Sequence, residues 1–177
     1  MKKFLLTLSM TALLLFTAGC SCPFSDKTAD SKSQMSTAKA SSAEVAPDFS
    51  YKELGSGKTM RLNDLKGKPV FINFWATWCP PCVGELPHIE KKYAEYKDKM
   101  HFIILSVDDN EQDPARFIQS KGYTFPAAYG DHQALGRAYG IDAIPASYII
   151  SADGHIVARI VGSMNESSLD AFLQKAF

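Results

Sequence analysis

A buried apolar run that ends in two closely spaced cysteines constrains this chain more than any other feature. The run from Pro69 to Trp75 has the length and composition of a buried strand. Cys79 and Cys82 follow it directly, and they open a segment that is predicted to be helical as far as Tyr96. The sequence therefore predicts that Cys79 lies where a strand leads into the N-terminus of a helix.

This position favours redox chemistry at Cys79. The first turn of a helix has free N–H groups and carries the positive end of the helix dipole. Both favour a thiolate over a thiol, and the thiolate is the nucleophile. Cys82 lies on the same helical face and within reach of a disulfide. We predict a redox-active pair in which Cys79 attacks and Cys82 resolves the mixed disulfide.

A C-x-x-C pair also serves as half of a zinc site, which is the alternative interpretation. Zinc would need two further Cys or His ligands at suitable spacing. The other cysteines, Cys20 and Cys22, lie far upstream, and the four histidines are scattered along the chain. We therefore expect no metal and no cofactor at this site.

The residues around the pair resemble a known family. The segment Phe74-Trp75-Ala76-x-Trp78-Cys79-x-x-Cys82 is similar to the active-site motif of the thioredoxin superfamily. The continuation Cys82-x-x-Glu85-x-Pro87 resembles its membrane-tethered extracytoplasmic branch, the TlpA/ResA-like thiol–disulfide oxidoreductases. The resemblance covers residues 46–177. It implies a thioredoxin-like α/β fold, in which helices flank a central mixed β-sheet, with an N-terminal β-hairpin and a central insertion.

The rest of the domain is interpreted on that fold. Strands are expected over 49–51 and 59–62 (a hairpin), 69–75, 101–107, 123–127, 146–150 and 155–160, and helices over 80–96, 114–121, 132–139 and after Ser163 or Asn165. The insertion spans 123–144. Asp153-Gly154 is predicted to be a two-residue hairpin turn. The acidic segment from Asp108 to Asp113 is interpreted as a solvated loop, because it lacks the Gly and Glu of a calcium-binding EF-hand.

The resemblance also implies which residues meet a substrate. Side chains and backbone near the pair are expected to form the surface that partner proteins touch: Trp78, Pro80, Pro81 and Ile144. Pro145 is expected to follow a cis peptide bond and to pack beside the cysteines. The alternative is an ordinary trans proline at the start of a strand.

Proton transfer from Cys82 needs a particular group here. Thioredoxins usually carry a buried Asp at the position of Asn73, and an amide cannot accept the proton. Glu85 lies three residues after Cys82 and hence on the same helical face. If that face is partly buried, the pKa of Glu85 rises toward the range of a general base. We predict a catalytic role for Glu85; the alternative is that it only complements the helix dipole.

We predict an enzyme that exchanges disulfides with other proteins. Pro80 and Pro81 offer neither an N–H nor a charge to a Cys79 thiolate, so the pair is expected to be reducing. By resemblance, apocytochrome c and methionine sulfoxide reductase are possible clients, and a membrane thiol–disulfide carrier is the electron donor. The alternatives are a disulfide-forming oxidant and a non-catalytic binding or copper-chaperone module. Copper-chaperone relatives, however, use C-x-x-x-C spacing.

Residues 1–19 have the pattern of an export signal. Lys2 and Lys3 precede an apolar stretch that is too short for a comfortable membrane span. The stretch ends in Thr17-Ala18-Gly19-Cys20, which resembles a bacterial lipoprotein signal, although Thr17 stands where Leu is usual. Cys20 would then be the lipid-modified N-terminus of a protein at the cell envelope. The alternative is an ordinary secretory signal.

Residues 20–45 are expected to be a flexible tether, because they contain almost no large apolar side chains. This leaves residues 46–177 as one folded domain, which we expect to be monomeric. The chain has 19 basic and 19 acidic residues, so its formal net charge is zero. Such a balance gives no indication of a nucleic-acid partner.

The first prediction concerns the anchor. We expect the wild-type protein in the membrane fraction, with Cys20 as its lipid-bearing N-terminus by mass spectrometry, because several acyl chains bind a membrane far more firmly than one. Cys20→Ser should release the protein while leaving dithiol activity intact, whereas the matched control Cys22→Ser should stay bound. A soluble wild-type protein, or a different mature terminus, contradicts this prediction.

Overall fold

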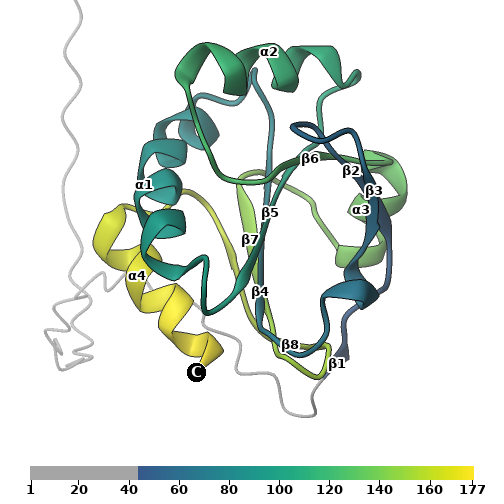
Figure 1. The fold of residues 1–177 in the computed structure, drawn as a ribbon, viewed down its shortest axis with the longest axis vertical. Coiled ribbons are helices and arrows are strands. Elements are labelled where there is room, and N and C mark those ends of the chain that lie inside the picture. Colours follow the sequence, from purple (N-terminus) through teal and green to yellow (C-terminus); the bar gives the residue numbers. More distant parts are fainter. Residues whose placement is uncertain (1–43) are drawn as a thin grey trace, which may run out of the picture. The chain divides into compact units, whose positions relative to one another are not determined.

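The computed structural model of the protein describes residues 44–177. Their eight strands form one mixed sheet in the order β1-β8-β7-β4-β5-β6-β2-β3 (Figure 1). The strands are β1 (Glu44–Val45), β2 (Ser50–Glu53), β3 (Thr59–Arg61), β4 (Val70–Trp75), β5 (His101–Ser106), β6 (Ala127–Tyr129), β7 (Ala146–Ile150) and β8 (His155–Val161). The helices are α1 (Pro80–Tyr96), α2 (Gln112–Lys121), α3 (His132–Tyr139) and α4 (Glu166–Leu173), with 3-10 turns at Leu62–Leu65 and Gln174–Ala176.

The centre of the sheet is β4, all six residues of which are buried. It pairs in parallel with β5, with Trp75 opposite Ser106, and antiparallel with β7, with Phe74 opposite Ala146. Such burial on both faces explains the unbroken apolar run in the sequence. Because β4 and β5 are parallel, their carboxyl ends lie at the same edge of the sheet, where α1 begins.

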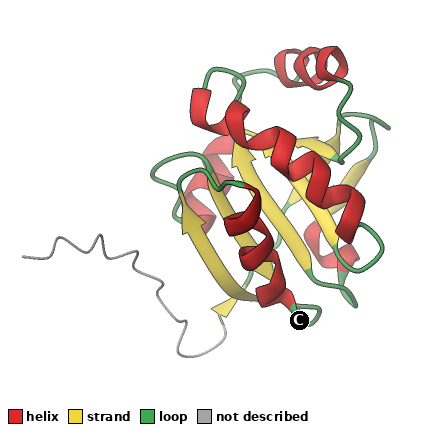
Figure 2. Cartoon of the chain, turned by 90° about the vertical axis from the view of Figure 1, so that its left-hand side faces the viewer, coloured by secondary structure: helices red, strands yellow, loops and turns green. Residues whose placement is uncertain are grey.

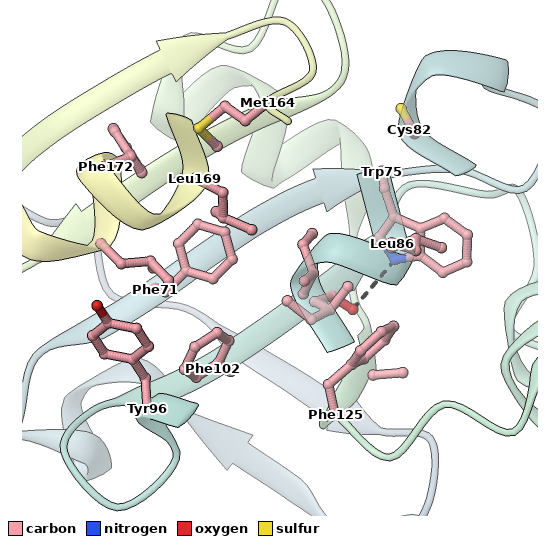
Figure 3. Packing of buried hydrophobic residues seen from close by; sticks show 14 of the residues in the cluster. Phe71, Trp75, Cys82, Leu86, Tyr96, Phe102, Phe125, Met164, Leu169 and Phe172 are labelled. Atoms are coloured by element: carbon pink, nitrogen blue, oxygen red, sulfur yellow. Dashed lines mark hydrogen bonds between the residues drawn. The ribbon is translucent and has the colours of Figure 1, made fainter. Parts of the chain in front are cut away.

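Helices cover both faces of the sheet (Figure 2). On one face, Phe71 and Trp75 belong to a cluster with Leu86 of α1 and Leu169 of α4; Figure 3 shows this cluster from close by. On the other face, Phe74 packs against the ring of Tyr139 from α3. Alternate residues of β4 therefore anchor the two helical layers.

The thioredoxin-like α/β fold is as predicted, and so are several local features. β2 and β3 pair as the expected N-terminal hairpin. Gly122 and Gly140 end α2 and α3 in the left-handed conformation, with φ of 68° and 60°. Asn165 is the cap of α4, because its side chain accepts a hydrogen bond from the N–H of Ser168.

The strand predicted over 123–127 is wrong: β6 begins only at Ala127. The backbone N–H groups of Thr124 and Phe125 donate to the carboxylate of Glu90, at 2.9 and 3.2 Å, instead of to a neighbouring strand. A side chain of α1 thus takes the hydrogen bonds that would have extended the strand.

The predicted two-residue turn at Asp153-Gly154 is also wrong, because residues 151–154 connect β7 and β8. The hydroxyl of Ser151 accepts from the N–H of His155 and donates to its carbonyl oxygen, at 3.0 and 3.1 Å. The N–H of Ser151 also donates to the carbonyl oxygen of His155 at 2.8 Å, so the backbone and the side chain of Ser151 together close a hairpin loop that is longer than two residues.

Ordered pairing begins slightly before the predicted domain boundary. Glu44 lies opposite Ile156 and Val45 opposite His155, so β1 extends the sheet beyond β8. The predicted export signal, Cys20 and nearly all of the predicted tether lie outside the described residues. Within 44–177, no helix has the length and apolar character needed to cross a membrane.

Candidate active site

Cys79 and Cys82 lie just beyond the carboxyl end of β4. Cys79 is the N-cap residue of α1, and the N–H of Cys82 donates to its Sγ at 3.3 Å. The two sulfurs form a disulfide of 2.04 Å, with the Cα atoms 5.3 Å apart. Cys79 is 5% exposed and Cys82 only 1%. The predicted nucleophile is therefore the more accessible sulfur, and the predicted resolving cysteine is covered.

The helix start offers little to stabilise a charge on Cys79. Pro80 and Pro81 have no N–H, and the N–H of Val83 already donates to the carbonyl oxygen of Cys79 at 3.0 Å. Within residues 44–177, the only backbone N–H that donates to this sulfur belongs to Cys82. Beyond that bond, the helix dipole is the remaining local source of stabilisation.

The loop before β7 lies against the sulfur pair. The Ile144–Pro145 peptide bond is cis, as predicted. The carbonyl oxygen of Ile144 is 3.9 Å from Cys79 Sγ, a distance at which a reduced thiol can donate to it. The carbonyl oxygen of Pro145 accepts from the N–H of Gly162 at 2.8 Å, which ties this loop to the end of β8.

The surface around Cys79 is apolar and open. Trp78 is 65% exposed, as expected for a rim residue, whereas Trp75 is fully buried. Pro80 and Pro81 are exposed as well. A pocket of about 490 Å³ lies beside Trp78, with Ile144 and residues around α3 in its walls. A larger pocket of about 790 Å³, between α2 and the β2–β3 turn, includes none of the predicted site residues.

Glu85, three residues after Cys82 in α1, is buried, so the condition set for a raised pKa is met. It is 1% exposed, its Oε1 accepts from the N–H of Met164 at 3.0 Å, and its Oε2 is 3.4 Å from Nδ2 of Asn73. Burial raises the pKa of Glu85 to about 7, although both hydrogen bonds act to lower it. A carboxyl group with such a pKa can both accept and release a proton near neutral pH.

Asn73 connects Glu85 to the strand that follows the cis proline. Its Nδ2 donates to Oγ of Ser147 at 2.9 Å, and its Oδ1 has no hydrogen-bond partner within the described part of the chain. Asn73 therefore hydrogen-bonds within the core, to Ser147 and toward Glu85. Sequence reasoning missed Ser147 and Met164; the one signal was a serine inside the apolar run of β7.

The position of Asp108 differs from the prediction that the segment from Asp108 to Asp113 is a solvated loop. Instead of belonging to a solvated loop, it is 2% exposed and accepts hydrogen bonds from Thr77 and Ser106. It lies two residues after the end of β5 and hence at the sheet edge that carries Cys79. Within residues 44–177, no group of three or more His, Cys, Asp or Glu side chains is placed to hold a metal ion.

The sulfur pair is built for exchange with another disulfide. Cys79, the less buried of the two, lies at the start of a helix and Cys82 is covered, a geometry that suits an exchange in which one sulfur attacks and the other resolves the mixed disulfide. On a thioredoxin-like sheet this arrangement defines a thiol–disulfide oxidoreductase. The chain belongs to the Redoxin family, whose pattern matches residues 39–173.

Two curated relatives and one solved structure carry related names. The chain is 38% identical over 131 residues to thiol-disulfide oxidoreductase ResA of Bacillus thuringiensis (strain Al Hakam), covering 73% of this chain and 75% of that protein. It is 34% identical over 174 residues to ResA of Halalkalibacterium halodurans, covering 98% and 94%. The crystal structure of the pneumococcal exposed lipoprotein thioredoxin (Etrx1) from Streptococcus pneumoniae matches with a TM-score of 0.64 at 26% identity, covering 73% and 99%. The chain is thus TlpA/ResA-like, as predicted.

The second prediction follows from the buried carboxyl group. Glu85 has an ordinary pKa of 4.5 but a pKa of about 7 in the folded protein, so folding favours its protonated form. Stability is fully retained below pH 4.5 and falls as the pH rises toward 7 and above. The loss amounts to a few kcal/mol at most, since one pKa unit corresponds to about 1.4 kcal/mol.

The measurement is the free energy of unfolding of the oxidised protein from pH 4 to 8, by denaturant titration. Glu85→Gln should gain stability relative to wild type across this range, because the amide keeps the size of the side chain without ionising. Glu44→Gln, which changes an exposed carboxylate, should follow the wild type. Parallel curves for wild type and Glu85→Gln contradict the raised pKa.

Proposed function

We propose that the protein is an extracytoplasmic, lipid-anchored reductant of protein disulfides. The observation that carries the proposal is the weak stabilisation available to a Cys79 thiolate, which accepts one backbone N–H bond across a Pro-Pro spacer. A strongly stabilised thiolate favours the reduced form and makes such a pair oxidising. A weakly stabilised one leaves the disulfide form favoured, so the dithiol readily gives its electrons to a partner.

The exchange proceeds in two balanced steps. The Cys79 thiolate attacks one sulfur of the client disulfide, which breaks that S–S bond, forms a mixed disulfide and releases the other client sulfur as a thiolate. Cys82, once deprotonated, attacks Cys79 Sγ and displaces the second client sulfur. The client gains two electrons and two protons, and Cys79 and Cys82 end as the observed disulfide.

Glu85 serves the second step as general base for Cys82. Cys82 is covered, so its thiol loses a proton to solvent poorly. Glu85 lies on the same face of α1, and its pKa of about 7 lets it take that proton at neutral pH. Asn73 and Met164 hold the carboxyl group in place from β4 and from the loop before α4.

A client segment docks across the apolar surface around Cys79. Trp78, Pro80 and Pro81 form the rim, and the carbonyl oxygen of Ile144 lies 3.9 Å from Cys79 Sγ. An extended peptide can pair with the backbone at Ile144 in a short β-like contact. We propose apocytochrome c or a methionine sulfoxide reductase as the protein whose disulfide is reduced. A membrane thiol–disulfide carrier then reduces the Cys79–Cys82 disulfide again, and the protein acts as a monomer.

The N-terminal segment and the relatives support the location. The pattern that ends in Cys20 fits a lipoprotein signal, and a related protein of known structure is named an exposed lipoprotein thioredoxin. In the proposed arrangement, the lipid on Cys20 holds the domain at the cell envelope through the segment that precedes β1.

The third prediction tests the direction of electron flow. The purified dithiol protein should reduce insulin, and its equilibrium with glutathione should lie on the side of the disulfide, because the Cys79 thiolate is weakly stabilised. A potential near that of the strongly oxidising DsbA, about −120 mV, overturns the reductant assignment. Absence of insulin reduction would instead favour a binding module.

Client identity follows from trapping in cells. Cys82→Ala should accumulate mixed disulfides through Cys79, because the resolving thiol is missing. Cys79→Ala is the matched control and should trap nothing. If Cys79→Ala traps as many mixed disulfides as Cys82→Ala does, the assignment of Cys79 as the nucleophile is contradicted.

The fourth prediction concerns Glu85 in catalysis. Glu85→Gln should slow release of the mixed disulfide about 10²-fold or more, within the range for loss of a general base, and remove its dependence on a group that titrates near pH 7. Formation of the mixed disulfide by Cys79 should change little. Stopped-flow measurement of both steps from pH 5 to 9 separates them. An unchanged rate and pH profile of release would leave Glu85 without a catalytic role.

A further inference from the structure

A buried carboxylate lies at the sheet edge beside the sulfur pair and takes no part in the exchange described above. Asp108 is 2% exposed and follows the end of β5. A buried charge is costly unless hydrogen bonds compensate it, so its position needs a reason. The hydrogen bonds that the carboxylate accepts from neighbouring residues suggest that reason.

Asp108 accepts three sets of hydrogen bonds. The N–H of Thr77 donates to both carboxylate oxygens, at 3.3 and 3.1 Å, and the hydroxyl of Thr77 donates to Oδ1 at 2.6 Å. The hydroxyl of Ser106 donates to Oδ2 at 2.7 Å and accepts from the N–H of Asp108 at 3.0 Å. Both carboxylate oxygens are satisfied, and most of their donors come from one residue of the turn before Cys79.

The hydrogen bonds of Asp108 lie just beyond the end of the parallel ladder between β4 and β5. The last ladder-like bond runs from the N–H of Val107 to the carbonyl oxygen of Trp75 at 2.8 Å. The turn that follows closes when the N–H of Cys79 donates to the carbonyl oxygen of Ala76 at 3.2 Å. Thr77 lies inside this turn, so Asp108 fixes the middle of the segment that delivers Cys79 to the start of α1.

We propose that Asp108 is a positioning residue of the redox centre: it holds the turn from Ala76 to Cys79, so that Cys79 Sγ stays within reach of the Cys82 N–H after the disulfide opens. In the oxidised protein the S–S bond itself ties Cys79 to α1. Reduction removes this tie, and the turn is then held by its own backbone bond, by the bond from the Val83 N–H to the carbonyl oxygen of Cys79, and by Asp108. Asp108 has this role whether the pair gives or takes electrons.

The test uses Asp108→Ala and Asp108→Asn in the full-length protein. The readouts are the pKa of the Cys79 thiol, from its alkylation rate as a function of pH, and the equilibrium with glutathione. Asp108→Ala should raise that pKa by about one unit, which lowers the thiolate fraction at neutral pH about tenfold. Asp108→Ala should also shift the equilibrium with glutathione further toward the disulfide, because the reduced protein loses more stabilisation than the oxidised protein. Asp108→Asn loses the same negative charge, but its amide oxygen still accepts from Thr77, so its Cys79 pKa should stay below that of Asp108→Ala, and the difference between the two variants separates positioning from charge.

A matched control separates positioning from stability. Tyr139→Phe removes a partly buried hydrogen bond of 2.7 Å, from the Tyr139 hydroxyl to the carbonyl oxygen of Pro47, on the other face of the sheet. It should lower the free energy of unfolding and leave the Cys79 pKa unchanged. All these variants retain the other titratable groups around the pair, namely Glu85 in α1 and Asp109, His132 and Asp142 around the pocket beside Trp78.

A second variant covers the case in which Asp108→Ala does not fold. Thr77→Val removes the hydroxyl that donates to Asp108 but keeps the backbone N–H bond. It should raise the Cys79 pKa less than Asp108→Ala does, and combining it with Asp108→Asn should add less than the sum of the two effects. Folded variants with an unchanged Cys79 pKa and an unchanged glutathione equilibrium overturn the proposal.

Discussion

Parallel pairing of β4 with β5 is the constraint on which the site depends. Parallel strands end at the same edge of a sheet, so the segments after Trp75 and after Ser106 must leave the sheet side by side. One of them carries Cys79 into α1, and the other carries Asp108. The antiparallel partner β7 begins at this edge too, which brings the Ile144–Pro145 loop to the sulfurs.

The burial of β4 on both faces explains why the polar residues near Glu85 are few and hydrogen-bonded to one another. β4 is buried on both faces, so Asn73 has no access to water and must find partners inside. It binds Ser147 of the neighbouring strand and approaches Glu85 of the covering helix. Even with these partners and the Met164 N–H, burial remains the larger influence on the carboxyl group. The pKa of Glu85 is therefore raised because its carboxyl group is buried between α1 and the sheet.

Apart from the position of Pro145, which the family resemblance implied, the site features predicted correctly depend on residues that are close together in sequence. The apolar run of β4, the cysteine spacing and the helical face shared by Cys82 and Glu85 depend on local periodicity, and the structure agrees with each. Contacts between distant segments left no such signal: Thr77 is 31 residues from Asp108, Asn73 is 74 from Ser147, and Glu85 is 79 from Met164. The same limit applies to β6, whose start is set by the carboxylate of Glu90 in another element.

The two sulfurs are controlled from different parts of the fold. The surroundings of Cys79 are backbone groups at a helix start, in a turn that is hydrogen-bonded to Asp108 just after β5, and we propose that they set the stability of the Cys79 thiolate. Cys82 is covered by the core, and the group that can take its proton is held from the loop before α4. In the proposed mechanism, a change in the first set alters the balance between dithiol and disulfide, whereas a change in the second alters the rate at which the mixed disulfide is resolved. The two sets share only Cys79, Cys82 and the helix that carries them, so separate substitutions can test the two proposed roles.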